Sequence, residues 1–221
     1  MLHISTMSGK LEGMRALNTD TTSNKFCIHM HEHSGEDFIC HWCYSWYMMQ
    51  TYRKNCVKKW KENSDMLSVP MPYDDLPVLN DVQFRIDAHG ELINLTHMAN
   101  IHWIAVKNPR TTVSLWTKRK GIIRQYLCQF TKPSNLMLIY SNGAIDKPVS
   151  SPPKGFDKVF QNVSPDKFLE LQNCTGQKCM SCRLCYTQGT DVITTADEGI
   201  DDVVTEAVKI QFKRLERKEI Q

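Results

Sequence analysis

Residues 82–141 read VQFRIDAHGELINLTHMANIHWIAVKNPRTTVSLWTKRKGIIRQYLCQFTKPSNLMLIYS, and their alternation of strand-like and helix-like runs decides the fold. The apolar periodicities predict strands at 82–87, 112–117 and 136–141, and helices at 95–107 and 121–130. Strands that alternate with helices of this length pair in parallel through right-handed crossovers. There are too few units for a closed eight-stranded barrel. We therefore expect an α/β protein built on an open parallel sheet or a partial (β/α) barrel.

The same patterns extend outward from a βα core at about residues 78–165 of a single 1–221 domain. They predict a short strand within 10–17, a helix at 40–60, a strand at 158–163 and an amphipathic C-terminal helix over 197–218. The last helix begins acidic and ends basic, which matches its dipole. Cys-rich segments at 27–43 and 174–185 flank the core.

Composition narrows the class of protein. Hydrophobic residues at 41%, charged residues at 23% and a net charge of +3 are ordinary for a globular chain. So small a net charge does not by itself indicate a nucleic-acid partner. No signal peptide opens the sequence, and no run reaches the roughly 18 apolar residues of a membrane helix. We expect a cytoplasmic protein without a membrane partner. In a reducing compartment clustered cysteines are more often metal ligands than disulfides.

Four of the nine cysteines fall in the run NCTGQKCMSCRLCYT, and we call them the late group: Cys174, Cys179, Cys182 and Cys185. Their C-x4-C-x2-C-x2-C spacing lets the chain curl around one centre, and four thiolates complete either a tetrahedral zinc site or a [4Fe–4S] cluster. Structural zinc usually takes two knuckles separated by a longer loop, whereas short consecutive spacing resembles ferredoxin loops. We expect an iron–sulfur cluster, with zinc as the alternative. The thiols could also be unligated or paired in disulfides.

A second set, the early group, comprises Cys27, Cys40 and Cys43. Cys40 and Cys43 stand at a predicted helix start, where the dipole favours thiolate. Three thiolates could leave one iron open to a substrate or supplement the late group, but Cys43 could also be simple core packing. The intervening loop carries alternating histidines, which fit an exposed polar loop as well as a metal site: His29, His31 and His33.

The two groups are expected to lie close together. The early group precedes the first predicted core strand and the late group follows the last, which puts them at opposite ends of the strands unless the chain folds back. The loop at 164–173 could span roughly 33 Å if extended, enough to cross a sheet. One shared centre or two neighbouring centres would result.

Charged residues follow two neighbouring predicted strands, and the ends of parallel strands are where α/β folds place chemistry. Asp87 and Glu91 follow the first strand with His89 between them, and these two acids are weak catalytic candidates. Basic residues follow the next strand and could hold a phosphate backbone, although solvated charge is the simpler account: Lys118, Arg119, Lys120 and Arg124. Further basic residues on the predicted 40–60 helix could contact a partner: Lys54, Lys58 and Lys59.

Several short motifs resemble those of the phage gene-product-eighty-eight family over about residues 10–186. They are the cysteine pair before Tyr44, FRIDAHGEL at 84–92, NPRTTVSLWTKR at 108–119 and PSNLMLIYSNG at 133–143. Family members show a Cys-rich N-terminus ending in CYA, a strand ending near Gly-Asp-Phe, a helix, and a phrase like P-x-x-x-F-x-x-YTK. The Gly-Asp-Phe appears here as Gly90-Glu91-Leu92, which keeps the acid. The resemblance implies iron–sulfur binding and a phage origin, and it supplies no reaction.

The βα order and Cys-rich N-terminal part are also similar to a shrunken radical S-adenosylmethionine fold. The C-x3-C-x2-C triad of that fold is absent, because Cys27 and Cys40 stand 13 positions apart, and no Gly-Gly-Glu-type run follows. We therefore expect an iron–sulfur phage protein with a binding or redox role, whose partner is nucleic acid or a host protein. A radical or redox enzyme and a structural zinc protein that binds nucleic acid are the alternatives, so the sequence leaves open whether the chain is an enzyme.

Overall fold

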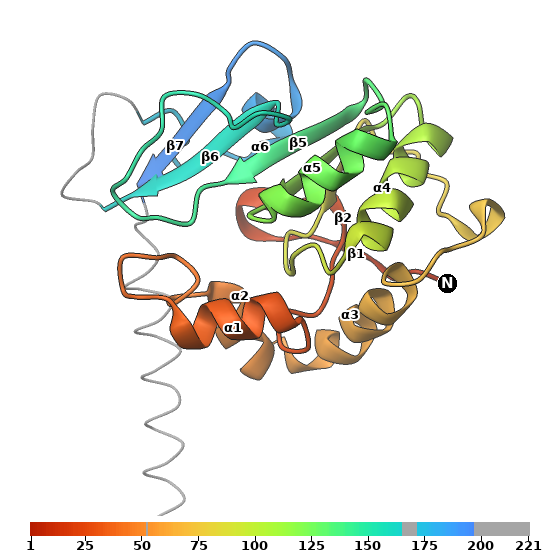
Figure 1. The fold of residues 1–221 in the computed structure, drawn as a ribbon, viewed down its shortest axis with the longest axis horizontal. Coiled ribbons are helices and arrows are strands. Elements are labelled where there is room, and N and C mark those ends of the chain that lie inside the picture. The colour runs from red at the N-terminus through yellow and green to blue at the C-terminus, as the bar shows by residue number, and fades with distance from the viewer. Residues whose placement is uncertain (52, 165–171, 197–221) are drawn as a thin grey trace, which may run out of the picture.

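The structure, a computed structural model, describes residues 1–51, 53–164 and 172–196. A 7-stranded sheet in the order β1-β2-β3-β4-β5-β6-β7 forms its centre (Figure 1). Its strands are β1 (Ile4–Thr6), β2 (Arg15–Leu17), β3 (Gln83–Ile86), β4 (Thr112–Thr117), β5 (Leu136–Ser141), β6 (Lys158–Val163) and β7 (Val192–Ala196). β1 pairs antiparallel with β2, and all other neighbours pair in parallel. The strand order follows the chain as in a (β/α) barrel, but β1 and β7 stay at opposite edges. The predicted open α/β sheet is confirmed.

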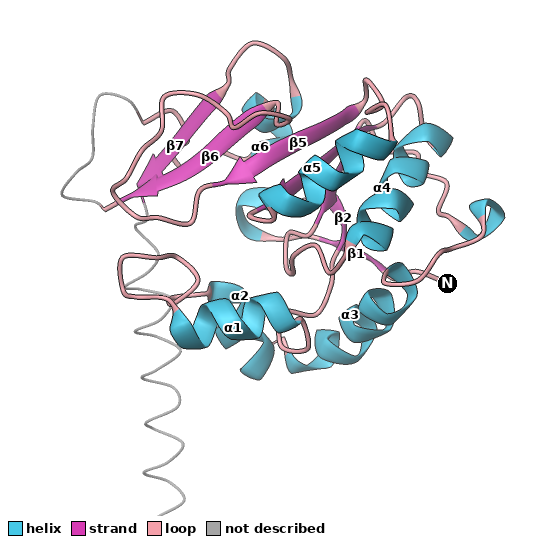
Figure 2. Ribbon diagram, in the orientation of Figure 1, coloured by secondary structure: helices cyan, strands magenta, loops and turns pink. Residues whose placement is uncertain are grey.

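Helices α1 to α3 belong to the connection between β2 and β3, while α4 and α5 connect the next strands and pack together on one face of the sheet (Figure 2). Their bounds are α1 (Lys25–His33), α2 (Tyr44–Gln50), α3 (Lys54–Leu67), α4 (Leu95–Lys107), α5 (Lys120–Gln129) and α6 (Cys179–Cys182). Short 3-10 turns are η1 (Gly9–Leu11), η2 (Tyr73–Asp75) and η4 (Leu184–Tyr186). Among the described residues, no helix is both long enough and apolar enough to cross a membrane.

The main core lies on the face of the sheet that α4 and α5 cover. Alternate side chains such as Phe84 of β3, Leu115 of β4 and Leu138 of β5 point into it. Ile101 of α4 and Tyr126 of α5 meet them from the helical layer, and each of these five side chains is fully buried. Burial of such side chains stabilises the fold by about 1.5–3 kcal/mol each, before the entropy cost of ordering them.

The opposite face of the sheet, which we call the inner face, has a smaller apolar cluster. Trp116 of β4 and Ile139 of β5 alternate with the residues of the main core and pack there with Met14 and Tyr186. Cys179, Met180 and Cys185 pack against this cluster. The inner face is therefore covered by the segment that carries the late cysteines.

The sequence located most central elements within a residue. The predicted strands at 112–117, 136–141 and 158–163 and the helix at 95–107 have the observed bounds, and the helix at 121–130 starts and ends one residue earlier. The strand within 10–17 is only Arg15–Leu17, because η1 precedes it. The predicted C-terminal helix lies outside the described residues.

Two predictions around the early cysteines were wrong, and two edge strands were missed. The single helix at 40–60 is two helices, α2 and α3; near the break the Thr51 hydroxyl donates to the Tyr47 carbonyl at 2.9 Å, a bond that competes with helix continuation. The histidine-rich loop is helix α1, whose start could have been found from Asn24, since its side chain accepts from the Phe26 amide at 3.0 Å. The edge strands β1 and β7 were not predicted.

The main core gives a direct stability test. Ile101→Ala should reduce the free energy of unfolding by about 2–5 kcal/mol, because it leaves a cavity beneath α4. Val106→Ala on the same helix is the control, since Val106 is 40% exposed and its loss should cost less than about 0.5 kcal/mol. Urea denaturation measures both, and equal costs would contradict the assigned packing face.

Candidate functional site

The early group lies at the C-terminal ends of the parallel strands. The chain leaves β2 at Leu17, and the Thr19 amide donates to the His89 carbonyl at 3.0 Å, which ties this segment to the loop after β3. The Ile39 amide donates to the Gly143 carbonyl at 2.8 Å, which ties the residue before Cys40 to the loop after β5. This edge is where α/β folds place chemistry.

The early thiols share one buried electrostatic environment. Burial raises the pKa of Cys27, Cys40 and Cys43, and the neighbouring thiols and Glu91 raise the pKa of Cys27 further. The Lys118 ammonium lowers the pKa of all three thiols. Burial lowers the pKa of Lys118 itself, but Cys40, Glu91 and the other two thiols outweigh burial and raise it to about 12. The early group therefore gathers around one cation.

Glu91 and Lys118 make different interactions at this edge of the sheet. The Glu91 carboxylate is buried and accepts from the Thr117 hydroxyl at 2.5 Å, the Leu92 amide at 2.8 Å and the Lys118 amide at 2.9 Å. It joins the ends of β3 and β4 and is fully engaged there. The Lys118 ammonium donates to the Ser141 hydroxyl at 3.2 Å, and its charge acts on the thiols.

Cys179 and Cys185 of the late group pack against the inner face, and this part of the segment is anchored at the starts of the strands. Cys179 and Cys182 belong to α6, and Cys185 belongs to η4. The backbone of Cys174 forms an isolated parallel β-bridge with Thr195 of β7. Lys178, the residue before α6, donates to the Gly9 carbonyl at 3.1 Å and to Glu12 at 2.6 Å. Both partners precede β2, so this end of the segment sits at the start of that strand.

Arg85 is the cation of the late group, and sequence reasoning missed it. Its guanidinium carbon lies 3.3 Å from the centre of the Trp116 ring. Burial raises the pKa of Cys179 and of Cys185, the latter to about 12, and Arg85 opposes both shifts. The Arg85 Nε is buried without a hydrogen-bond partner. The alternation of Gln83, Arg85 and Asp87 opposite the apolar Phe84 and Ile86 was the available signal.

Unpartnered polar atoms gather around Arg85. Gln83 Oε1, Asp87 Oδ2 and Ser114 Oγ are also buried without hydrogen-bond partners, and Ser114 is the register partner of Arg85. Burial raises the pKa of Asp87 well above its usual range, although Thr19 donates to the other oxygen at 2.7 Å. Unsatisfied buried groups mark places for water, an ion or a cofactor.

The donor chemistry of the late group fits an iron–sulfur cluster. All nine cysteines are free thiols, so the disulfide alternative is absent from the structure. Within the described ranges, no three side chains of His, Cys, Asp or Glu form a group that could hold a metal ion. The unpartnered Arg85 Nε–H needs an acceptor, and cluster sulfur accepts such hydrogen bonds.

That the two groups lie close together stays a prediction. Each group falls at a different place in its crossover. The early group stands at the beginning of the β2–β3 connection, at the strand ends. The residues from Cys179 to Cys185 stand at the end of the β6–β7 connection, before Val192 starts the next strand.

The histidines and the other basic residues are mostly engaged within the protein. His31 stacks on Trp46, and its Nδ1 lies 3.2 Å from the Cys40 carbonyl, so it packs against the backbone of the early group. The His29 and His33 rings stack on each other at 4.6 Å. Two of the basic candidates lie over aromatic rings, Arg119 over Phe26 and Lys120 over Tyr140.

Four basic candidates remain at exposed positions on helices: Lys54, Lys58 and Lys59 of α3, and Arg124 of α5. Lys59 forms an ion pair with Glu62 at 3.0 Å. Because Lys118 instead acts on the early thiols, the predicted basic cluster after β4 does not present a single charged surface.

No protein-family model, curated protein or solved structure matches this chain.

His89 gives a pH-dependent stability test. It is buried, its ring stacks on Trp60 at 4.6 Å, and burial, then Arg53 and Arg85, lower its pKa to about 4. Because the unfolded pKa is about 6.5, this neutral ring contributes stability above that pH, and the contribution is lost as the pH falls towards 4. The loss should be about 3 kcal/mol.

Urea denaturation of His89→Gln between those pH values should show a weaker acid dependence than the parent chain. The exposed His33→Gln is the control and should retain the full dependence. Identical pH profiles for the parent chain and His89→Gln would contradict the buried neutral state of His89.

Proposed function

We propose that this chain is a phage-encoded iron–sulfur protein that binds a [4Fe–4S] cluster through the late group and uses it in electron transfer. The ligands are Cys174, Cys179, Cys182 and Cys185. The observation that carries the proposal is the unpartnered Nε of Arg85 on the inner face, within electrostatic reach of Cys179 and Cys185.

A buried N–H without an acceptor is costly, and the Nε–H of the half-buried Arg85 is such a group. A cluster held by four thiolates carries net negative charge and accepts hydrogen bonds at sulfur, so it would satisfy this N–H. Trp116, Tyr186 and Met14 pack beside the late group and shield it from water. Solvent exclusion and hydrogen bonds to sulfur are the means by which proteins tune the reduction potential of such clusters.

Zinc bound by the same residues is the alternative for this site, because a set of four cysteine thiolates is also common in structural zinc sites. The tight consecutive spacing favours the cluster. The two metals differ in sulfide content and colour, so chemical analysis separates them.

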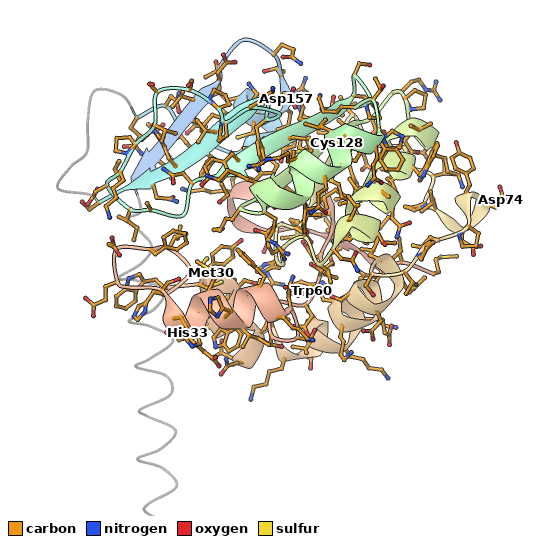
Figure 3. The ribbon with its side chains drawn as sticks, in the orientation of Figure 1. Met30, His33, Trp60, Asp74, Cys128 and Asp157 are labelled. Atoms are coloured by element: carbon orange, nitrogen blue, oxygen red, sulfur yellow. The ribbon has the colours of Figure 1, made fainter. Side chains whose placement is uncertain are left out.

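Anaerobically purified protein should contain iron and acid-labile sulfide in equal amounts. Replacing the four late cysteines with serine should remove about four irons per chain, because serine does not provide the thiolate ligands. The control is Cys128→Ser, which changes the exposed thiol of α5 (Figure 3) and should leave iron content unchanged. A colourless protein with stoichiometric zinc and no sulfide would contradict the cluster.

Arg85→Gln should lower the reduction potential of the cluster, because the lost positive charge favoured the more negative reduced state. A shift of about 60 mV, a tenfold change in a one-electron equilibrium, is the expected scale. Arg15→Gln is the matched control: Arg15 precedes Ala16, the register partner of Arg85, but its side chain pairs with Asp81 at 3.1 Å. Equal reduction potentials for Arg85→Gln and the parent chain in a redox titration would contradict an interaction between Arg85 and the cluster.

A second candidate function is a radical or redox enzyme that uses the early group. It is favoured by the gathering of Cys27, Cys40 and Cys43 around Lys118 at the strand ends. Three thiolates would leave one iron open to a substrate, with Glu91 beside it and Asp87 nearby. Cleavage of S-adenosylmethionine after dithionite reduction would support this function, and its absence in protein that retains early-group iron would exclude adenosylmethionine chemistry.

For location and partners, we propose the cytoplasm of the infected host, where reduced thiols persist. A nucleic acid or a host protein is the proposed partner, with the exposed lysines of α3 as its contact surface. Retention on DNA or RNA at about 50 mM salt, lost at higher salt, would support nucleic acid, because phosphate contacts release counterions. Lack of retention at low salt would leave the host protein.

A further inference from the structure

A cavity of about 260 Å³ lies between the edge strand β1 and α3. It is lined by the chain from His3 to Met7 and by Arg53, Cys56, Trp60 and His89. Neither the late nor the early cysteines contribute to its walls. Trp60 projects from α3 beneath the sheet (Figure 3), and its indole N–H donates to the Ser5 hydroxyl at 3.3 Å across one side of the cavity.

The walls of this cavity carry positive charge and no acid. None of its lining residues is Asp or Glu. Arg53 donates from Nη2 to the Ser8 hydroxyl at 3.0 Å, but its Nε is buried without a partner. A guanidinium that lines a cavity with an unused N–H is suited to an oxoanion.

His89 adds a second donor. Its Nδ1 lies 3.0 Å from the Ser45 hydroxyl, which lies 2.7 Å from the Thr21 hydroxyl. In the tautomer that accepts from Ser45 at Nδ1, Nε2 carries the ring proton, and His89, which lines the cavity, can donate it. The side chain is only 4% exposed and is fixed by stacking on Trp60. Two donors, one of them charged, are thus available from rigid neighbours.

We infer that this cavity binds the phosphate or carboxylate group of a small anionic molecule through Arg53 and His89. The Ser5 hydroxyl, which accepts from Trp60, retains its own proton as a further donor. A volume of about 260 Å³ corresponds to about eight or nine water-sized groups, which is enough room for a phosphate or carboxylate group. This site is separate from the proposed cluster and does not depend on it.

Isothermal titration of the anaerobically purified protein with inorganic phosphate tests the inference, with sodium chloride at equal ionic strength as the reference titrant. Saturable binding of one phosphate per chain is expected. Arg53→Gln should weaken it at least tenfold, because the charged donor is lost. Arg15→Gln makes the same change at a residue that pairs with Asp81 outside the cavity, and it should leave phosphate binding unchanged. Titration with acetate then shows which of the two anions the cavity prefers. Saturable binding of either anion supports the inference.

The indole N–H resonance of Trp60 gives a readout that needs no variant. It should shift with phosphate and not with chloride at the same ionic strength, because Trp60 lines the cavity. Three outcomes would overturn the inference: no saturable binding of either anion, equal weakening by Arg53→Gln and Arg15→Gln, or an unmoved Trp60 resonance at phosphate saturation. If Arg53→Gln does not fold, the Trp60 resonance of the parent chain decides alone.

Discussion

The position of Arg85 on the inner face of β3 is the constraint on which the account of this protein depends. Its guanidinium stacks on Trp116, its Nε lacks a partner, and it acts on the pKa of Cys179 and Cys185. An unpartnered buried N–H in this place is costly. The helices α4 and α5 close the other face with a mainly apolar layer, in which α4 also buries His97, Asn100 and His102.

Crossover connections divide that chemistry into two sites. Each connection crosses the sheet once, so a motif at its beginning lies at the strand ends and a motif at its end lies at the strand starts. The early group begins the β2–β3 connection and meets Lys118, while α6 and η4 end the β6–β7 connection and meet Arg85. Each set of thiols therefore has its own cation.

Much of the sheet could be predicted because its strands and helices bury strongly periodic faces. The runs at 112–117 and 136–141 alternate between the main core and the inner face, and the helix at 95–107 fills one layer. Helix α1 was not predicted, because it buries no side chain completely. Its sequence therefore shows no clear helical periodicity of apolar residues between the histidines. β1, with three residues, is too short to show alternation.

The candidate sites were only half predictable. Clustered cysteines identify soft ligands by spacing alone, but their cations depend on tertiary position. Lys118 looked like one member of a basic surface run, and only the buried end of β4 turns it towards thiols. Arg85 sits inside a strand, where a charged residue usually marks an exposed face. The cavity beside His89 depends on α3 packing across β1, which no local pattern encodes.

The most direct test of the central claim is the ⁵⁷Fe Mössbauer spectrum of a variant that keeps only the late group. In this variant Cys27, Cys40 and Cys43 are replaced by serine, and the protein is prepared without oxygen. The account predicts the spectrum of one [4Fe–4S] cluster per chain, held by Cys174, Cys179, Cys182 and Cys185. Iron absent from this variant, or replaced by zinc at one ion per chain, would contradict it.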